Sequence, residues 1–197
     1  MDELRARKAA LRKALLAGRD ALPAAARADL SRRITQRLLA LPALSAARTV
    51  LAYASFGSEF DTSALVDALL AAGKRLALPR VDREVRRLEL FFVTSVQRDL
   101  EPGVWGIREP APERCRPATL DEIDLVLTPG VAFSPRCERL GYGGGYYDQL
   151  LAGQPAGLFT VAAAFELQLV PDLPLGPADV PVDLVVTETA IYRRPTG

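Results

Sequence analysis

The sequence predicts a three-layer α/β/α fold in which helices cover both faces of a mostly parallel, Rossmann-like sheet. Several short apolar runs lack the alternation of half-exposed strands, which is typical of strands buried on both faces. A strand, a helix and a second strand follow one another within residues 49–78. This βαβ order implies a parallel pair of strands joined by a right-handed crossover.

Two helices are expected before the first strand. Apolar residues recur at helical spacing over residues 2–18 and again over residues 23–42. Gly18 or the Ala21-Leu22-Pro23 segment is expected to end the first helix, and Pro42 the second. We expect this N-terminal pair of helices, residues 1–42, to pack on the α/β body, so that residues 1–197 form one domain. Domains commonly span ~100 to 200 residues.

The remaining elements are located by short apolar runs and by turn residues. The βαβ unit is predicted as a strand at 49–53, a helix at 62–72 capped by Asp61 and ended by Gly73, and a strand at 75–78. Further strands are expected at 88–93, 123–128, 159–164 and 184–187. Residues 99–120 contain four prolines and are predicted to form a long irregular connection, of the kind that is often functional.

Composition excludes several classes of mechanism. The chain contains no histidine, so it has no histidine general base, and its two cysteines cannot complete a zinc site. Cys115 and Cys137 are more naturally reduced thiols than a disulfide, because the N-terminus is charged throughout and lacks the apolar segment of a secretory signal. No apolar stretch approaches the ~20 residues of a membrane span. A cytoplasmic, monomeric protein without a membrane partner is expected.

Charge argues against a general nucleic-acid surface, since the net charge is only +1. The first forty residues nevertheless carry ten Lys or Arg against four Asp or Glu. A solvated helical arm is the ordinary interpretation of such a segment, and an anion-binding site is the alternative.

The segment Arg139–Asp148 reads Arg-Leu-Gly-Tyr-Gly-Gly-Gly-Tyr-Tyr-Asp and follows the predicted strand 123–128. Ligands of open α/β sheets bind beyond the carboxyl ends of strands. Consecutive glycine N–H groups can line a phosphate-sized concavity, although a flexible glycine turn is the simpler alternative. Arg139 suits phosphate oxygens and Asp148 suits magnesium. Their position beside the loop favours phosphate binding, although neither a Walker A nor a Rossmann pattern is present.

This segment, preceded by Pro129-Gly-Val-Ala-Phe133, resembles the signature of the 5-formyltetrahydrofolate cyclo-ligases. The resemblance continues in order over most of the chain, with matching segments at 8–12, 55–59, 79–80, 105–110 and 179–183. It implies ATP-driven cyclisation of 5-formyltetrahydrofolate to 5,10-methenyltetrahydrofolate, with Mg²⁺ as cofactor and ATP as co-substrate. Some family members carry basic residues in the glycine run where this chain has Tyr142 and Gly144, so phosphate charge must be met elsewhere.

The resemblance also implies roles for individual residues. The nucleotide-binding set is Lys8, Arg12, Arg139, Leu140, Gly141, Tyr142, Gly143, Gly144, Gly145, Tyr146 and Tyr147. The folate-binding set is Ala54, Phe56, Glu59, Trp105, Tyr142 and Tyr146, with Glu59 as the anchor of the pterin edge. Arg139 and Tyr146 are expected to be catalytic, and Asp148 and Asp179 to hold Mg²⁺. Plainer roles stay open for single residues: a helix cap for Asp148, a surface position for Glu59 and simple packing for Trp105.

Helix geometry gives independent evidence on Lys8 and Arg12. At ~100° per residue, Lys8 lies ~40° from Leu4 and ~20° from Leu15, inside the apolar stripe that should face the protein. Arg12 follows at i+4 on the same side. A cation at the edge of the core needs either room to reach solvent or an anionic partner. An ATP phosphate is the predicted partner, and a solvated helix edge is the alternative.

Two other functions remain open on the residues alone. The glycine loop would also suit a different nucleotide-using α/β enzyme, such as a small kinase or a sugar-phosphate enzyme. The basic N-terminal helices would suit an RNA-binding accessory domain, although no RNA-binding module is recognisable in the sequence.

Overall fold

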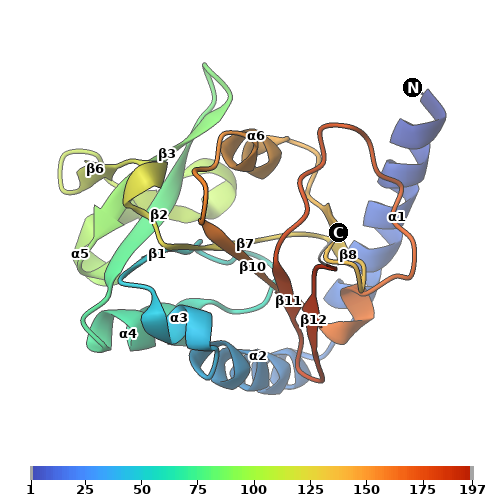
Figure 1. Cartoon of the computed structure of the whole chain (residues 1–197), viewed down its shortest axis with the longest axis horizontal. Helices are drawn as coiled ribbons and strands as arrows, with labels where there is room; N and C mark the ends of the chain where they lie inside the picture. The colour runs from blue at the N-terminus through green and yellow to red at the C-terminus, as the bar shows by residue number, and fades with distance from the viewer. Residues whose placement is uncertain (1, 196–197) are drawn as a thin grey trace.

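The computed structural model describes residues 2–195 and contains a central sheet of eight strands in the order β12-β11-β10-β7-β1-β2-β3-β6 (Figure 1). The strands are β1 (Thr49–Leu51), β2 (Arg75–Asp82), β3 (Arg87–Val93), β6 (Arg116–Ala118), β7 (Leu125–Thr128), β10 (Phe159–Ala163), β11 (Leu184–Val186) and β12 (Ile191–Arg193). The neighbouring strands β11, β10, β7, β1 and β2 are parallel, whereas β12, β3 and β6 join antiparallel at the edges. The mostly parallel sheet, including the parallel β1–β2 pair, is confirmed.

Both faces of the sheet are covered, which explains the continuous apolar runs of its central strands. Helices α2 (Ala24–Leu39), α3 (Pro42–Ala46) and α4 (Ser63–Ala71) lie on one face, and α6 (Tyr146–Ala152) lies on the other (Figure 1). Within β1, Val50 packs into the core on the α2–α4 side, and its neighbour Leu51 packs into the core that includes Leu151 of α6. The three-layer prediction is therefore confirmed.

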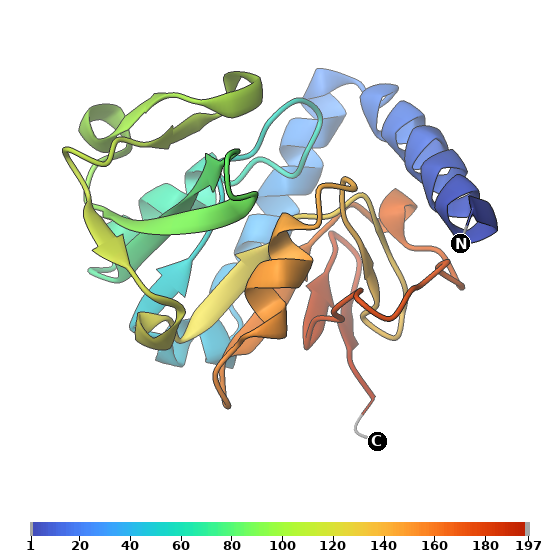
Figure 2. The same ribbon diagram turned by 90° about the horizontal axis from the view of Figure 1, so that it is seen from above.

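The two predicted N-terminal helices are present, but they occupy different places. Helix α1 (Asp2–Asp20) packs beside β8 (Ala132–Phe133) and the short helix η3 (Glu166–Gln168), at the end of the molecule away from β3, whereas α2 lies under the sheet (Figures 1 and 2). Pro42 does more than end the second helix. It occupies the first turn of α3, where the missing N–H of proline is not needed.

The prediction of an irregular connection over residues 99–120 is wrong. This region contains the end of α5 (Val96–Asp99), a hairpin of β4 (Leu100–Pro102) and β5 (Arg108–Pro110) around η1 (Val104–Gly106), the edge strand β6, and the start of η2 (Leu120–Glu122). The prolines are compatible with these strands because each strand has an unpaired edge, where a missing N–H removes no ladder hydrogen bond.

Strand order reverses between β1 and β7. From β1 the chain continues to β2 and β3 on one side, and from β7 it continues to β10 and β11 on the other side. The connections that leave the adjacent carboxyl ends of β1 and β7 therefore diverge. A crevice at such a switch point is the usual ligand site of an open α/β sheet.

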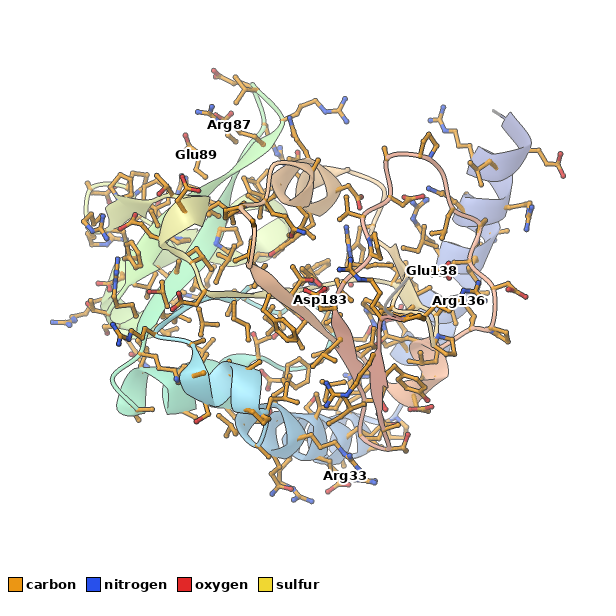
Figure 3. The ribbon with its side chains drawn as sticks, viewed as in Figure 1. Arg33, Arg87, Glu89, Arg136, Glu138 and Asp183 are labelled. Carbon is orange, nitrogen blue, oxygen red and sulfur yellow. The ribbon has the colours of Figure 1, made fainter. Side chains whose placement is uncertain are left out.

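Exposed ion pairs and a structural carboxylate differ in their surroundings (Figure 3). The pairs Arg87–Glu89 and Arg136–Glu138 join an exposed arginine to a glutamate two residues away, with N–O distances of 3.4 and 3.2 Å. Such pairs contribute little to stability. Asp183, before β11, instead accepts hydrogen bonds from the backbone N–H and the hydroxyl of Thr160 in β10, both at 2.8 Å. It thereby fixes the register of two parallel strands.

Two further predictions concern the cysteines and the membrane. Cys115 and Cys137 are both buried free thiols, which confirms the expectation of reduced cysteines. None of the helices within residues 2–195 combines the length and apolarity that a membrane span requires.

The core beneath the sheet should dominate stability. Leu69 of α4 is completely buried, so Leu69→Ala is expected to lower the free energy of unfolding by about 2–5 kcal/mol through lost burial and the cavity left behind. Leu39 of α2 is 43% exposed, and Leu39→Ala is the matched control, with an expected loss below ~1 kcal/mol. Urea denaturation of the variants measures the difference, and equal losses would contradict this assignment of the core.

Candidate active site

A cavity of about 540 Å³ opens at the carboxyl ends of β1 and β7. Its walls come from the segment after β1, the β2–β3 hairpin, the η1–β5 segment, the residue after β7 and the glycine-rich segment. The lining residues are Tyr53, Ala54, Phe56, Glu59, Pro79, Val81, Arg86, Leu88, Ile107, Arg108, Glu109, Pro129, Arg139, Gly141, Tyr142, Gly144, Gly145, Tyr146, Tyr147 and Asp148. The volume falls in the ~300–1,000 Å³ range of small-molecule sites.

The glycine-rich segment forms one wall of this cavity. It begins as β9 (Arg139–Leu140), paired antiparallel with β8, and passes through a loop into α6. Gly143 and Gly145 have φ values of 101° and 76°, which other residues rarely adopt. Because Gly145 caps α6, this helix starts at Tyr146. The two tyrosines and Asp148 therefore occupy the first turn of α6.

Arg139 links the start of α6 to the end of β7 through two hydrogen bonds. Its guanidinium is almost fully buried and donates from Nη2 to Asp148 Oδ1 at 2.5 Å and from Nη1 to the carbonyl oxygen of Pro129 at 3.3 Å. Among residues 2–195, Arg139 Nε and the hydroxyl of Tyr147 are buried without a hydrogen-bond partner. Buried donors of this kind are usually completed by water or by a ligand.

Glu59 is the buried carboxylate of the cavity, with 7% of its surface exposed. Its Oε2 accepts the N–H of Phe56 at 3.0 Å, and its Oε1 accepts the hydroxyl of Tyr142 at 2.6 Å. Burial raises the pKa of Glu59, and these two hydrogen bonds and the charge of Arg19 oppose that rise. The plain interpretation of Glu59 as a surface glutamate is therefore wrong.

Aromatic side chains surround this carboxylate. The rings of Phe56 and Tyr142 lie 5.3 Å apart between centroids, tilted by 44°, and both are partly exposed. Tyr142 thus spans from the glycine loop to the segment after β1. Burial raises the pKa values of Tyr53, Tyr142 and Tyr147, so these phenols are neutral hydrogen-bonding groups at physiological pH.

Lys8 and Arg12 lie on the covered side of α1, as helix geometry predicts. Lys8 Nζ contacts Asp179 Oδ2 at 2.5 Å, and Arg12 Nε donates to the carbonyl oxygen of Gly141 at 2.7 Å. Burial lowers the pKa of Arg12, and the nearby charges of Asp179 and Asp148 oppose this shift. The plain hypothesis of a fully solvated helix edge is wrong, because both cations have partners within the protein.

The two predicted metal ligands, Asp148 and Asp179, accept hydrogen bonds from the segment before β11. Asp148 Oδ1 also accepts the N–H of Val180 at 3.2 Å, and Asp179 Oδ2 accepts the N–H of Gly176 at 2.5 Å. Within residues 2–195, no group of three or more His, Cys, Asp or Glu side chains is arranged to hold a metal ion. This donor set fits Mg²⁺ only as an ion completed by water and substrate phosphates, which is its common mode of binding.

The structure brings most of the predicted site residues together. Those that line the cavity are Ala54, Phe56, Glu59, Arg139, Gly141, Tyr142, Gly144, Gly145, Tyr146, Tyr147 and Asp148. Lys8, Arg12, Leu140, Gly143 and Asp179 lie outside its lining, and the Leu140 side chain is fully buried. The backbone of Trp105 belongs to η1, but its side chain lies outside the described part of the structure.

Two buried charged residues near the cavity were not predicted. Glu109 is 3% exposed and accepts the N–H of Val81 at 3.3 Å, and burial raises its pKa. It lies within the matching segment 105–110. Arg19 of α1 is also 3% exposed. It follows Lys8 by eleven residues, which places it ~20° away on the same helix face, so the same geometry could have found it.

Comparison with known proteins identifies relatives over nearly the whole chain. Residues 4–188 match the 5-formyltetrahydrofolate cyclo-ligase family. A 5-formyltetrahydrofolate cyclo-ligase of Escherichia coli is 32% identical over 84% of this chain and 91% of its own length. One of Mycolicibacterium smegmatis is 33% identical over 91% of this chain and 93% of its own. A solved 5,10-methenyltetrahydrofolate synthetase of Aquifex aeolicus superposes with a TM-score of 0.84 at 33% identity, covering 96% of this chain and 94% of that one.

The buried charge of Glu59 should reduce stability at neutral pH. Because its pKa is raised in the folded state, its favourable contribution is present at low pH and is lost as pH rises through the folded-state pKa. We expect Glu59→Gln to raise the melting temperature at neutral pH by about 2–4 °C, the effect of ~1 kcal/mol in a chain of this size. The gain should shrink towards acidic pH. Thermal unfolding over a pH series measures it, and a gain independent of pH would contradict the raised pKa.

Proposed function

Because the chain belongs to the 5-formyltetrahydrofolate cyclo-ligase family, we propose that it cyclises 5-formyltetrahydrofolate to 5,10-methenyltetrahydrofolate in an ATP- and Mg²⁺-dependent reaction that releases ADP and phosphate. The observation that supports this most is the cavity at the switch point, which has the buried carboxylate of Glu59 on one wall and the glycine loop on another. Glu59, proposed to bind the pterin, and the glycine loop, proposed to bind phosphate, therefore line the same cavity.

The folate is proposed to bind with its pterin edge at Glu59. A carboxylate can accept paired hydrogen bonds from the N–H donors of the amino-pyrimidinone ring. Glu59 Oε1 accepts a hydrogen bond from the Tyr142 hydroxyl. Tyr142 would therefore have to exchange this partner when the substrate binds. Ala54, Phe56 and Tyr146 line the same cavity and would flank the folate rings, together with the predicted Trp105.

ATP is proposed to bind between α1 and the glycine loop. Arg12 already contacts this loop, and a Cβ atom added at Gly143 would lie 3.5 Å from Arg12 Cζ. Tyr142 and Gly144 add no positive charge to the loop, so the charge needed by the phosphates would come from Lys8, Arg12 and Arg139. Phosphate oxygens would replace the carboxylate partner of Lys8, and the loop N–H groups would add further donors.

Asp148 and Asp179 are proposed to hold Mg²⁺, which would neutralise phosphate charge when bound. Each carboxylate has a cation beside it and faces Arg12. The cations of these pairs would turn to the phosphates while the carboxylates turn to the metal ion. This exchange keeps the charges of the site compensated.

In the proposed reaction, the formyl oxygen attacks the γ-phosphorus of ATP and ADP leaves. N10 of the folate then attacks the activated carbon, the C–O bond breaks with loss of phosphate, and N10 loses its proton. Phosphoryl transfer depends mainly on positioning and charge neutralisation, which suits a site without histidine. Arg139 would compensate the charge of the transferred group, and Tyr146 would orient the formyl group.

The test is incubation of the protein with 5-formyltetrahydrofolate and Mg-ATP, while the absorbance of the methenyl product and the formation of ADP are followed together. We expect both products in equal amounts, and neither when folate, ATP or Mg²⁺ is omitted. ADP formation that needs no folate would instead favour another nucleotide-using α/β enzyme. Salt-dependent RNA retention without ATP turnover would favour an RNA-binding domain.

The proposed nucleotide site predicts a specific effect of the α1 cations. Lys8→Met combined with Arg12→Met keeps much of the apolar stems and removes both charges. We expect the KM for ATP to rise at least ~10-fold, since hydrogen bonds to charged groups contribute roughly 1.5–3 kcal/mol each, with a smaller change in the KM for folate.

The matched control for these two substitutions is Arg7→Met with Lys13→Met. It removes the same charge from exposed positions of the same helix and should leave both KM values unchanged. Initial-rate kinetics with each substrate varied in turn give the four values. If both double variants affected ATP equally, the effect would be one of overall charge, and Lys8 and Arg12 would not be nucleotide ligands.

A further inference from the structure

Arg19 is a buried cation that the proposed reaction does not use. It lies in the last turn of α1, only 3% of its surface is exposed, and its Nε donates to Ser58 Oγ at 3.0 Å. Ser58 Oγ in turn donates to Asp20. Among residues 2–195, the guanidinium of Arg19 forms no ion pair with a carboxylate. A buried charge without a paired partner is costly, so this position calls for an explanation.

The surroundings of Arg19 lead directly to Glu59. The guanidinium carbon lies 5.7 Å from the centroid of the Tyr142 ring, and the hydroxyl of this tyrosine donates to Glu59. Ser58, which accepts the hydrogen bond from Arg19, is the residue before Glu59 in the chain. The positive charge of Arg19 lowers the pKa of Glu59 against the effect of burial. Arg19 thus faces the Glu59–Tyr142 pair from the side of α1.

Arg19 acts through these neighbours and not on the ligand itself, because it does not line the cavity. We propose that Arg19 is a positioning residue for folate binding: it supplies a buried positive charge beside Glu59 that favours the carboxylate form, and it holds residues 58–59 and Tyr142 in place. This inference rests on the proposed function of Glu59 as the acceptor of the pterin N–H groups. A protonated carboxyl could not accept two such hydrogen bonds as a carboxylate does.

The other groups that face Glu59 cannot replace this charge. They are Tyr53 after β1, Tyr142 in the glycine loop and Tyr147 in α6. All three are neutral, because burial raises the pKa of each phenol. Arg19 is therefore the cation of this group, and its removal should raise the pKa of Glu59 further. Folate binding would then weaken as pH falls and recover as pH rises.

The test compares the wild type with Arg19→Gln and Arg19→Lys, with the KM for folate and for ATP measured from mildly acidic to mildly alkaline pH. For Arg19→Gln we expect the folate KM to rise about tenfold at neutral pH, which corresponds to ~1.4 kcal/mol, and to approach the wild-type value at alkaline pH. The ATP KM should change less than about twofold. Arg19→Lys keeps the charge and should keep the wild-type pH profile.

Arg37→Gln is the matched control. Arg37 is a partly buried arginine of α2, and its Nε donates to the carbonyl oxygen of Glu188 at 3.2 Å. Its replacement changes the charge by the same amount away from the cavity, so both KM values should stay as in the wild type. Formation of the methenyl product by the wild type tests the proposed function separately. In an active wild type, an unchanged folate KM in Arg19→Gln, or a rise that does not depend on pH, overturns the role of Arg19.

If Arg19→Gln is less stable than the wild type, a second substitution distinguishes charge compensation from a purely structural role. If Arg19 compensates the charge of Glu59, Glu59→Gln should raise the melting temperature more in the Arg19→Gln variant than in the wild type, and this excess gain is the expected recovery. A purely structural role of Arg19 predicts no such recovery. Thermal unfolding of the wild type, both single variants and the double variant measures this recovery even if Arg19→Gln is too unstable for kinetics, and equal gains from Glu59→Gln in both backgrounds overturn the proposal.

Discussion

The reversal of strand order between β1 and β7 is the constraint on which the rest of the site depends. Two adjacent parallel strands end at the same edge of the sheet, but the chain leaves them towards opposite sides. No crossover helix can cover the space between the two departures. The segment that carries Glu59 and the segment that carries the glycine loop are therefore the natural walls of one cavity. Their sequences need only supply suitable side chains at positions that topology already brings together.

Charge compensation is the second organising element. Arg139 pairs with Asp148 and Lys8 pairs with Asp179, while Arg19 faces Glu59 without forming an ion pair with it. Isolated charges in such a covered place would be expensive, and paired ones are tolerated. In the proposed reaction, ATP phosphates and Mg²⁺ would replace the partners within these pairs, so that each charge keeps a counter-charge.

The sequence predicted the features that depend on local pattern and failed where long-range contacts decide. Helix periodicity placed Lys8 on the covered face of α1, but its carboxylate partner Asp179 lies 171 residues away, beyond the reach of any local rule. Proline content suggested irregular structure over residues 99–120, whereas edge strands tolerate proline. The composition of the glycine loop pointed to a segment that lines the cavity. The positive φ of Gly145, which starts α6 early and brings Asp148 into its first turn, could not be predicted from composition.

The docking of α1 joins the first turns of the chain to a segment near its end. The contact between Lys8 and Asp179 joins residues 171 positions apart, and closing a loop of this length costs conformational entropy. By thermodynamic linkage, any ligand that bridges α1 and the glycine loop also strengthens the attachment of the N-terminal helix. Ligand binding at the site and docking of α1 on the rest of the protein are thus thermodynamically coupled.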